Sequence, residues 1–265
     1  MKKSVYAFFI LSLFSYACQT QQENTQDDST RQNEAQGIID QAIDVHGGDQ
    51  LENTHISFDF RKRHFEVDMH QGKYQYESFF EDSIGSVHDV LNNQRFTREV
   101  NGEKINLSAK DSIAFKNSLN SVVYFALLPY FLNDPAVNKK LLGETMIKSE
   151  PYDEIRVTFD QEGGGTDHED VYIYWIHQED KTMDYLAYSF HVNEGGTRFR
   201  EAYNVREIEG IRFADYINYE STVEEFNLED YETLFEEGKV EELSRIDLEN
   251  VEVSQSAEAP AISMQ

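Results

Sequence analysis

Alternation of apolar and polar residues with a period of two constrains the fold of this 265-residue chain more than any other feature. Ile56, Phe58 and Phe60 alternate with polar neighbours, and segments 65–69 and 74–80 repeat the pattern. Because successive side chains of a strand point to opposite faces, each segment predicts a strand with one buried face. Further strands are expected at 95–100, 103–107, 141–147, 155–159, 171–177, 185–192, 197–205, 211–219 and 246–253. Short turns such as Asn101-Gly102 separate them, which indicates antiparallel pairing of neighbours.

Two segments show helical spacing instead. Residues 34–46 place apolar side chains at a period near 3.6 and end at Gly47-Gly48, which predicts a short amphipathic helix with a glycine C-cap. A second helix is expected to begin at Ser108 with a capping-box-like sequence and to end or kink at Pro129. Its apolar end is too short to span a bilayer, which takes about 20 residues, so we expect it to be buried in the protein or to lie over the protein's own apolar surface.

These elements predict a mainly β (α+β) domain over residues 35–256. About ten antiparallel strands form a single curved sheet, an unclosed half-barrel, because an open sheet of this width curls and one face must be covered. The N-terminal and mid-chain helices are expected to cover the concave face. Residues 257–265 are expected to form a frayed tail.

The N-terminus has the features of an export signal. Lys2 and Lys3 precede an apolar run of about ten residues, followed by small residues at a cleavage site. The segment resembles a bacterial lipoprotein signal, which implies that residues 1–17 are removed and that Cys18 takes a thioether-linked diacylglycerol. Simple secretion is the alternative, since the small side chains before Cys18 also satisfy the rule for ordinary cleavage.

Residues 19–34 contain no Ile, Leu, Val, Met or aromatic residue. Such a segment cannot offset its ordering entropy by burial, so residues 18–34 are expected to form the lipidated cysteine and a disordered tether. The tether would hold the domain near a membrane rather than in it. Together with this tether, the resemblance to a lipoprotein signal implies a location in the envelope of a Gram-negative bacterium, at the periplasmic or surface face of the outer membrane.

The charge of the chain excludes several partners. The formal net charge is −27, and a surface this acidic would be repelled by nucleic acid and by anionic lipid headgroups. Residues 220–265 hold 14 acidic and 2 basic residues, a concentration that could dock another envelope protein. A single cysteine excludes a disulfide scaffold and a cysteine-based zinc site.

Two short segments resemble a known family. The sequence VHGGDQL at residues 45–51 leads into an aromatic hairpin, and LLPYFLNDP at residues 127–135 ends the second helix. Both resemble uncharacterised envelope lipoproteins with the fold of the Lol lipoprotein carrier, a LolA-like half-barrel with a helical lid. The resemblance implies an extracytoplasmic protein that holds an acyl chain or another apolar ligand, and it transfers no catalytic residue.

In such a half-barrel, large apolar side chains of the second helix and of two later strands could line a cavity. The candidates are Tyr124, Phe125, Leu127, Leu128, Phe131, Trp175, Tyr188 and Phe190. A filled core without a cavity is the alternative, because core and pocket walls use the same residue types.

Histidines and carboxylates form two weak metal-like patterns. His64 and Glu66 alternate along one strand face with Asp68 and His70, but six residues of strand span about 20 Å, so the four cannot share one ion. His168, Glu169 and Asp170, together with His177, form the second pattern. In so acidic a chain both are expected to be solvated polar groups, and we predict no metal and no cofactor.

His46 lies before the two glycines that end the first helix. It is expected to be structural, with a partly positive imidazole that offsets the helix dipole. No Gly-x-Ser-x-Gly nucleophile motif is present in the sequence. We therefore predict a non-enzymatic cell-envelope lipoprotein that binds a hydrophobic or amphiphilic ligand, with an acidic docking module, or an enzyme acting on glycans or lipids, as alternatives.

Overall fold

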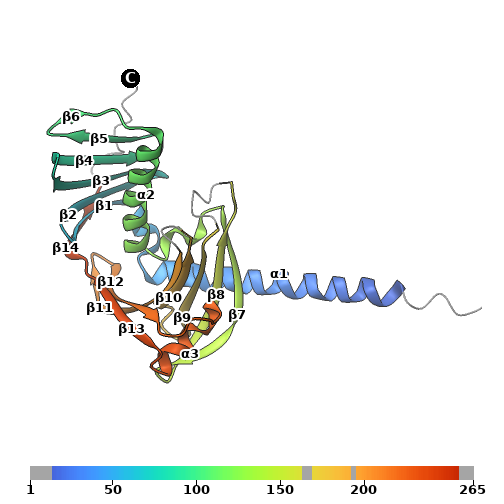
Figure 1. Ribbon diagram of the computed structural model, residues 1–265. Coiled ribbons are helices and arrows are strands. Elements are labelled where there is room, and N and C mark those ends of the chain that lie inside the picture. The colour runs from blue at the N-terminus through green and yellow to red at the C-terminus, as the bar shows by residue number, and fades with distance from the viewer. Residues whose placement is uncertain (1–13, 163–168, 192–194, 257–265) are drawn as a thin grey trace, which may run out of the picture.

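The computed structural model describes residues 14–162, 169–191 and 195–256, and within them the strands form two antiparallel sheets of seven (Figure 1). One sheet contains β1 (Asn53–Phe60), β2 (Arg63–His70), β3 (Lys73–Asp82), β4 (Gly85–Asn92), β5 (Phe96–Val100), β6 (Glu103–Lys104) and β14 (Glu249–Gln255). The other contains β7 (Val137–Ile147), β8 (Glu150–Phe159), β9 (Val171–His177), β10 (Met183–Phe190), β11 (Gly196–Ile208), β12 (Ile211–Ser221) and β13 (Val240–Ile246). Their orders are β14-β1-β2-β3-β4-β5-β6 and β13-β12-β11-β10-β9-β8-β7.

The mainly β, unclosed architecture is confirmed, but the prediction of a single sheet of about ten strands is wrong. The segment 246–253, expected to be one strand, is divided between the end of β13 and most of β14. Asp247 and Leu248 carry the chain from the edge of the second sheet to the edge of the first. A strongly twisted sheet rarely continues past about ten strands without curling or splitting, which accounts for the division.

Alternation along the strands is confirmed by burial. In β2, Phe65, Val67 and Met69 are buried, whereas the residues between them are partly exposed on the opposite face. β1 pairs with β2 in continuous register, so Ile56 lies opposite Val67 and Phe58 opposite Phe65. The two phenyl rings stack with their centroids 5.2 Å apart. This first hairpin supplies one wall of the core.

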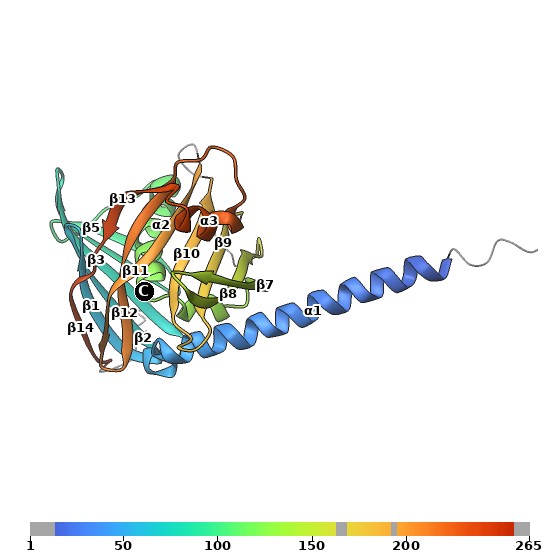
Figure 2. The ribbon, with the colours of Figure 1, turned by 90° about the horizontal axis from the view of Figure 1, so that it is seen from below.

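Helix α2 (Ala109–Ala126) lies on the concave side, and the strands of both sheets curve around it (Figure 2). The Ser108 hydroxyl accepts the backbone N–H of Asp111 at 3.1 Å, as the capping sequence predicts. Leu119 and Val123 pack against the first sheet in one hydrophobic cluster. The helix ends just before Pro129, and a 3-10 turn over Tyr130–Asn133 follows it.

Helix α1 (Phe14–Val45) is longer than the sequence predicts and extends away from the body (Figure 1). Its last part buries Ala35, Ile39 and Ala42 in a second cluster, against the concave face of the second sheet. Residues 18–34, predicted to be a disordered tether, continue the same helix, since no glycine or proline interrupts residues 14–34.

Residues 1–13 and 257–265 lie outside the described residues, as does the side chain of Cys18. The predicted signal peptide, acylated cysteine and frayed tail therefore stay predictions. Among the described residues, no helix combines the length and the hydropathy that crossing a membrane requires.

The convex face of the second sheet has its own cover, which the sequence did not reveal. Helix α3 (Tyr231–Glu236) packs there with Tyr231 fully buried. Phe199 stacks on Tyr231 at 5.6 Å and meets Trp175 edge-on at 5.5 Å. Helix α3 thus covers the convex face of the second sheet, and part of the concave face borders the space beside α2.

Candidate functional site

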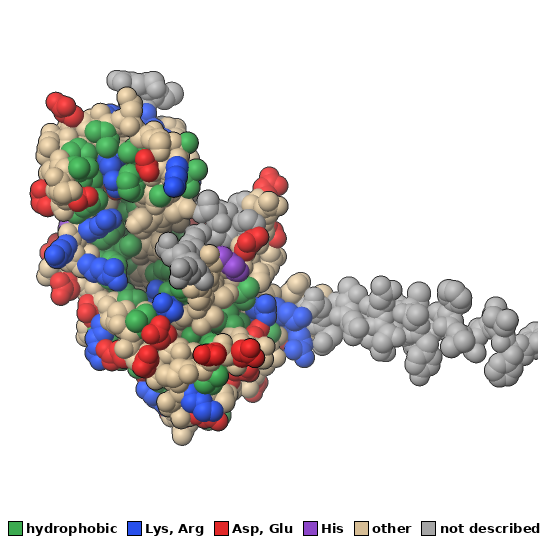
Figure 3. All heavy atoms as spheres, in the orientation of Figure 1, with side chains coloured by type: hydrophobic (Ala, Val, Ile, Leu, Met, Phe, Trp, Pro, Cys, Tyr) green, Lys and Arg blue, Asp and Glu red, His purple; other side chains and the backbone are tan. Residues whose placement is uncertain are grey.

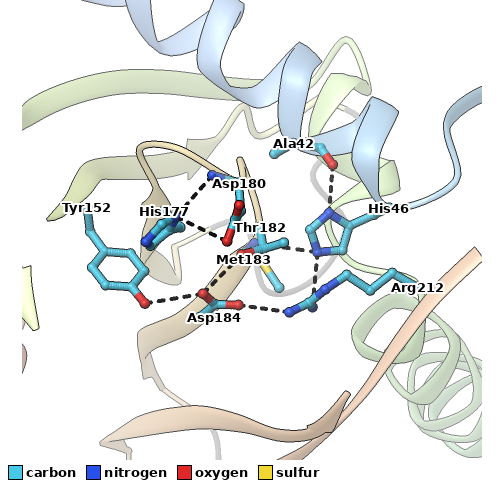
Figure 4. A network of polar contacts seen from close by, with 9 residues as sticks. All are labelled: Ala42, His46, Tyr152, His177, Asp180, Thr182, Met183, Asp184 and Arg212. Atoms are coloured by element: carbon cyan, nitrogen blue, oxygen red, sulfur yellow. Dashed lines mark hydrogen bonds and ion pairs between the residues drawn. The ribbon is translucent and has the colours of Figure 1, made fainter. Parts of the chain in front are cut away.

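The His-Gly-Gly segment joins α1 to the second sheet (Figure 4). His46 is only 4% exposed, and its Nδ1–H donates to the Ala42 carbonyl at 2.7 Å. Its Nε2 accepts the backbone N–H of Met183 at 3.4 Å and lies 3.3 Å from Nη1 of Arg212. These bonds fix the Nδ1-protonated tautomer and tie the end of α1 to β10 and β12.

The predicted positive character of His46 is wrong. Burial, reinforced by the neighbouring Arg212 charge, lowers its pKa from 6.5 to about 4, so the imidazole is neutral. Arg212 pairs instead with Asp184 at 2.8 Å, and that carboxylate also accepts the hydroxyls of Tyr152 and Thr182. Through these contacts the network joins the end of α1 to β8, β10 and β12 (Figure 4).

The Gly47 that follows has little room for a side chain. Its φ is +127°, and an added Cβ would lie 3.1 Å from Cγ1 of Ile211. The close approach lets β12 pass directly beside the end of α1. The motif that suggested the family resemblance is therefore a structural joint.

A cavity of about 420 Å³ opens between the concave face of the second sheet and α2. Figure 3 shows a hollow between the two sheets, with hydrophobic and Lys or Arg side chains along it. Val122 and Phe125 of α2 form one wall, and Tyr172, Tyr188 and Phe190 come from β9 and β10. Tyr172 and Tyr188 stack 5.5 Å apart. Volume and lining both lie in the range of small-molecule sites.

A second cavity of about 520 Å³ lies on another side of α2. Lys116, Asn120 and Tyr124 face it from the helix, with Tyr130 and Phe131 from the turn that follows. Its helix wall is polar, whereas the wall that α2 gives to the first cavity is mostly apolar. The helix therefore divides the concave space into two compartments of different character.

The predicted ligand-binding residues do not all line one cavity. Phe125, Tyr188 and Phe190 line the first cavity. Tyr124 and Phe131 line the second. Leu127 and Leu128 are buried in the clusters beneath α2 and line neither.

Trp175 also lines neither cavity, because it points to the convex face and is fully buried under α3. The period of two already carried this information. Tyr172 and Tyr174 share one face of β9, and Trp175, one residue further on, must take the other.

Three arginines at the first cavity were not foreseen. Arg198 and Arg200, two residues apart on β11, face the cavity, and Arg61 reaches it from the turn after β1. The signal was present as Arg198-Phe199-Arg200 within an alternating strand. Asp170 is the acidic residue among the described lining residues. The cavity wall is thus basic in a chain that is strongly acidic overall.

Two tyrosines at the cavity, Tyr172 and Tyr216, are held in their neutral form. Burial, followed by the charge of Asp170, raises the pKa of Tyr172 well above its ordinary value. Burial also raises the pKa of Tyr216 to about 12, although the nearby Arg212 and Arg200 oppose the shift. These hydroxyls therefore serve as hydrogen-bonding groups at neutral pH.

The metal-like patterns do not converge. His64 pairs with Asp59 at 2.7 Å and lies 3.7 Å from Glu66, on the outer face of the first sheet. Asp170 contacts Nδ1 of His191 at 3.2 Å, and His168 lies outside the described residues. In the described part of the chain, no group of three or more His, Cys, Asp or Glu side chains is placed to hold a metal.

Comparison with known proteins gives a family and a fold. The model of DUF6503, a family of unknown function, matches residues 5–248. No curated protein matches the chain. A DUF1329 family protein from Desulfovibrio piger is similar with 10% identity and a TM-score of 0.50, over 82% of this chain and 92% of that one. At this identity the likeness concerns the fold alone.

A LolA superfamily protein from Nitrosomonas europaea is similar with 12% identity and a TM-score of 0.49, over 85% of this chain and 94% of that one.

Proposed function

Since the chain belongs to the DUF6503 family, whose function is unknown, we propose a function from the site itself: the protein binds a hydrophobic or amphiphilic ligand and catalyses no reaction. The observation that carries this proposal is the cavity of about 420 Å³ beside α2. Tyr172 and Tyr188 stack, and the Phe125 ring lies tilted against Tyr188, so the three side chains give it an aromatic wall. A concave, mostly apolar site with a few polar groups is the usual form of a small-molecule site.

The proposed setting is the bacterial envelope, with the mature chain anchored through an acylated Cys18. The support is the export signal followed by the single cysteine of the chain. Helix α1 would then serve as the spacer between the anchor and the body. From Cys18 to Ala35, where burial begins, a helix rising 1.5 Å per residue spans roughly 25 Å.

The anchor is tested by fractionating cells that express the full chain or its Cys18→Ser variant. We expect the wild-type chain in the membrane fraction and the variant in the soluble fraction, because several acyl chains hold a protein where one holds it marginally. A Cys18→Ser variant that stays in the membrane fraction would refute the anchor.

The cavity is tested by filling it. Ser121 is exposed and lines the cavity from α2, so Ser121→Trp should occupy the space without displacing core residues. Ser118→Trp is the matched control, because Ser118 is exposed on the same helix and lines neither cavity. The probe is N-phenyl-1-naphthylamine, a neutral apolar dye whose fluorescence rises in an apolar site.

We expect Ser121→Trp to weaken dye binding at least tenfold and Ser118→Trp to change it less than twofold. Thermal unfolding of both variants checks that each is folded. Equal dye binding by the two variants would mean that the dye does not enter this cavity, and the proposed function would fail.

A further inference from the structure

Arg200 is a buried arginine without a carboxylate partner. It is 9% exposed, and its Nη2 donates to the Tyr188 hydroxyl at 2.8 Å. Its Nε lies 3.5 Å from Oδ1 of Asn218, and the guanidinium lies over the Phe125 ring at 4.3 Å. Among the described residues, no Asp or Glu comes within ion-pair distance of this guanidinium. A buried charge is costly unless an opposite charge offsets it.

The other arginines of low exposure in this chain are paired. Arg98 is 6% exposed and makes two bonds of 2.6 Å to the Asp89 carboxylate. Arg212 pairs with Asp184 at 2.8 Å. Arg200 differs from them in that its neighbours are neutral, and it lines the first cavity, which Arg98 and Arg212 do not. Its position therefore indicates that the missing anion comes from a ligand.

Two arginines that are more exposed than Arg200 add positive charge to the lining of the cavity. Arg61 lies over the Phe60 ring at 5.0 Å, and no acidic partner for it occurs among the described residues. Arg198 is only loosely associated with Glu220, at 3.8 Å. Against these charges stands Asp170, which is engaged with His191. The balance at the described lining favours an anion.

The rest of the lining accommodates an apolar chain. Val122, Tyr172, Ile246 and Leu248 contribute apolar surface around the same space. A volume of about 420 Å³ suits one acyl chain better than several. A ligand that satisfies both parts has a single apolar tail and an anionic head.

We infer that the cavity binds a single-chain amphiphile whose carboxylate or phosphate head is held by Arg200, with Arg61 and Arg198 beside it. The inference rests on the proposed function and names its ligand class. The planar guanidinium offers parallel N–H donors that match both headgroups, and the aromatic wall takes the chain.

The test compares three probes with the same twelve-carbon chain: dodecanoate, dodecyl phosphate and neutral dodecanol. The protein is the full chain carrying Cys18→Ser, and each probe displaces N-phenyl-1-naphthylamine. The variant is Arg200→Gln. The control is Arg95→Gln, which removes the same charge from an exposed residue that lines neither cavity.

We expect at least one anionic probe to bind ten times more tightly than dodecanol or better, and Arg200→Gln to reduce that preference to less than threefold. Arg95→Gln should leave it unchanged. The stronger of the two anionic probes identifies the headgroup. Should Arg200→Gln not fold, Arg61→Gln is expected to lower the preference about threefold. The preference of the wild-type chain for an anionic probe over dodecanol then decides whether the ligand carries an anionic head.

Equal binding of the three probes by the wild-type chain would overturn the inference and leave the proposed function standing. Displacement of the dye by none of them, together with dye binding that Ser121→Trp leaves unchanged, would overturn both. The two failures are therefore distinguishable.

Discussion

The buried neutral state of His46 gives a quantitative prediction of pH dependence. Its pKa falls from 6.5 in an exposed setting to about 4 in the folded protein, chiefly through burial and then through the charge of Arg212. A group whose pKa is lowered by folding stabilises the protein above the unfolded value and loses that contribution as pH falls toward the folded value. Protonation therefore favours the unfolded chain between about pH 6.5 and pH 4.

The magnitude follows from the two values. Each tenfold change in a protonation equilibrium corresponds to about 1.4 kcal/mol, so the full penalty is about 3 kcal/mol. At pH 5, the wild-type chain should already have lost about 2 kcal/mol through this residue alone. The other titrating groups of the chain also contribute, so the measurement must be a difference between two proteins.

The perturbation is His46→Gln, which keeps a polar side chain but removes the titration. At pH 8 the variant should be less stable by about 1–3 kcal/mol, because the bonds to Ala42 and Met183 are lost or distorted. At pH 5 the difference between the two proteins should be smaller by about 2 kcal/mol. His191→Gln, which replaces an exposed histidine, controls for the loss of an imidazole.

The assay is urea unfolding of the full chain carrying Cys18→Ser, with and without His46→Gln, at pH 8, 7, 6 and 5. The free energy of unfolding is extrapolated to water at each pH. A difference between the two proteins that stays constant within about 0.5 kcal/mol from pH 8 to pH 5 would refute the buried neutral imidazole.

Three further predictions concern stability. Burial, and then the charge of the nearby Glu232, raise the pKa of Glu154 to about 7, so the wild-type chain should lose stability relative to Glu154→Gln as pH rises from 5 to 8. A difference in melting temperature between the two proteins that stays the same from pH 5 to pH 8 would contradict this. Leu132 is fully buried, so Leu132→Ala should cost about 2–5 kcal/mol in urea unfolding, and a cost below 1 kcal/mol would mean that the site is loosely packed. Gly47→Ala should lower the free energy of unfolding by about 1–3 kcal/mol because the φ of Gly47 is positive. Gly37→Ala should raise it by about 0.5–1 kcal/mol, because Gly37 lies inside α1 with open space around it. A change of the same sign for both variants would refute the conformational argument.

Local patterns predicted much of the secondary structure. Alternation located β1, β2 and β3, and the capping sequence at Ser108 located the start of α2. These signals are local because period, caps and turns depend on residues within a few positions of one another. β4 and α3 were missed. β13 is an edge strand that is mostly exposed, so its alternation is weak, and it was merged with β14.

The candidate site shows more clearly which features local sequence patterns predict and which they do not. Alternation alone separates Trp175 from Tyr172, but it cannot say which face of β9 is concave, since that depends on how the second sheet curves around α2. Sequence placed Phe125 and Tyr188 among the candidates because they are large and apolar. It could not distinguish a wall from a filled core.

By itself, therefore, the sequence determined a β-rich chain, its glycine joint and its aromatic strands. Only the tertiary structure decided the division into two sheets, the neutral state of His46 and the position of Arg200 at the cavity. Each of these depends on residues far apart in the chain: Arg212 lies 166 positions from His46, and Phe125 lies 75 positions before Arg200. A charge or a cavity is a property of the groups that surround it, and folding alone brings those groups together.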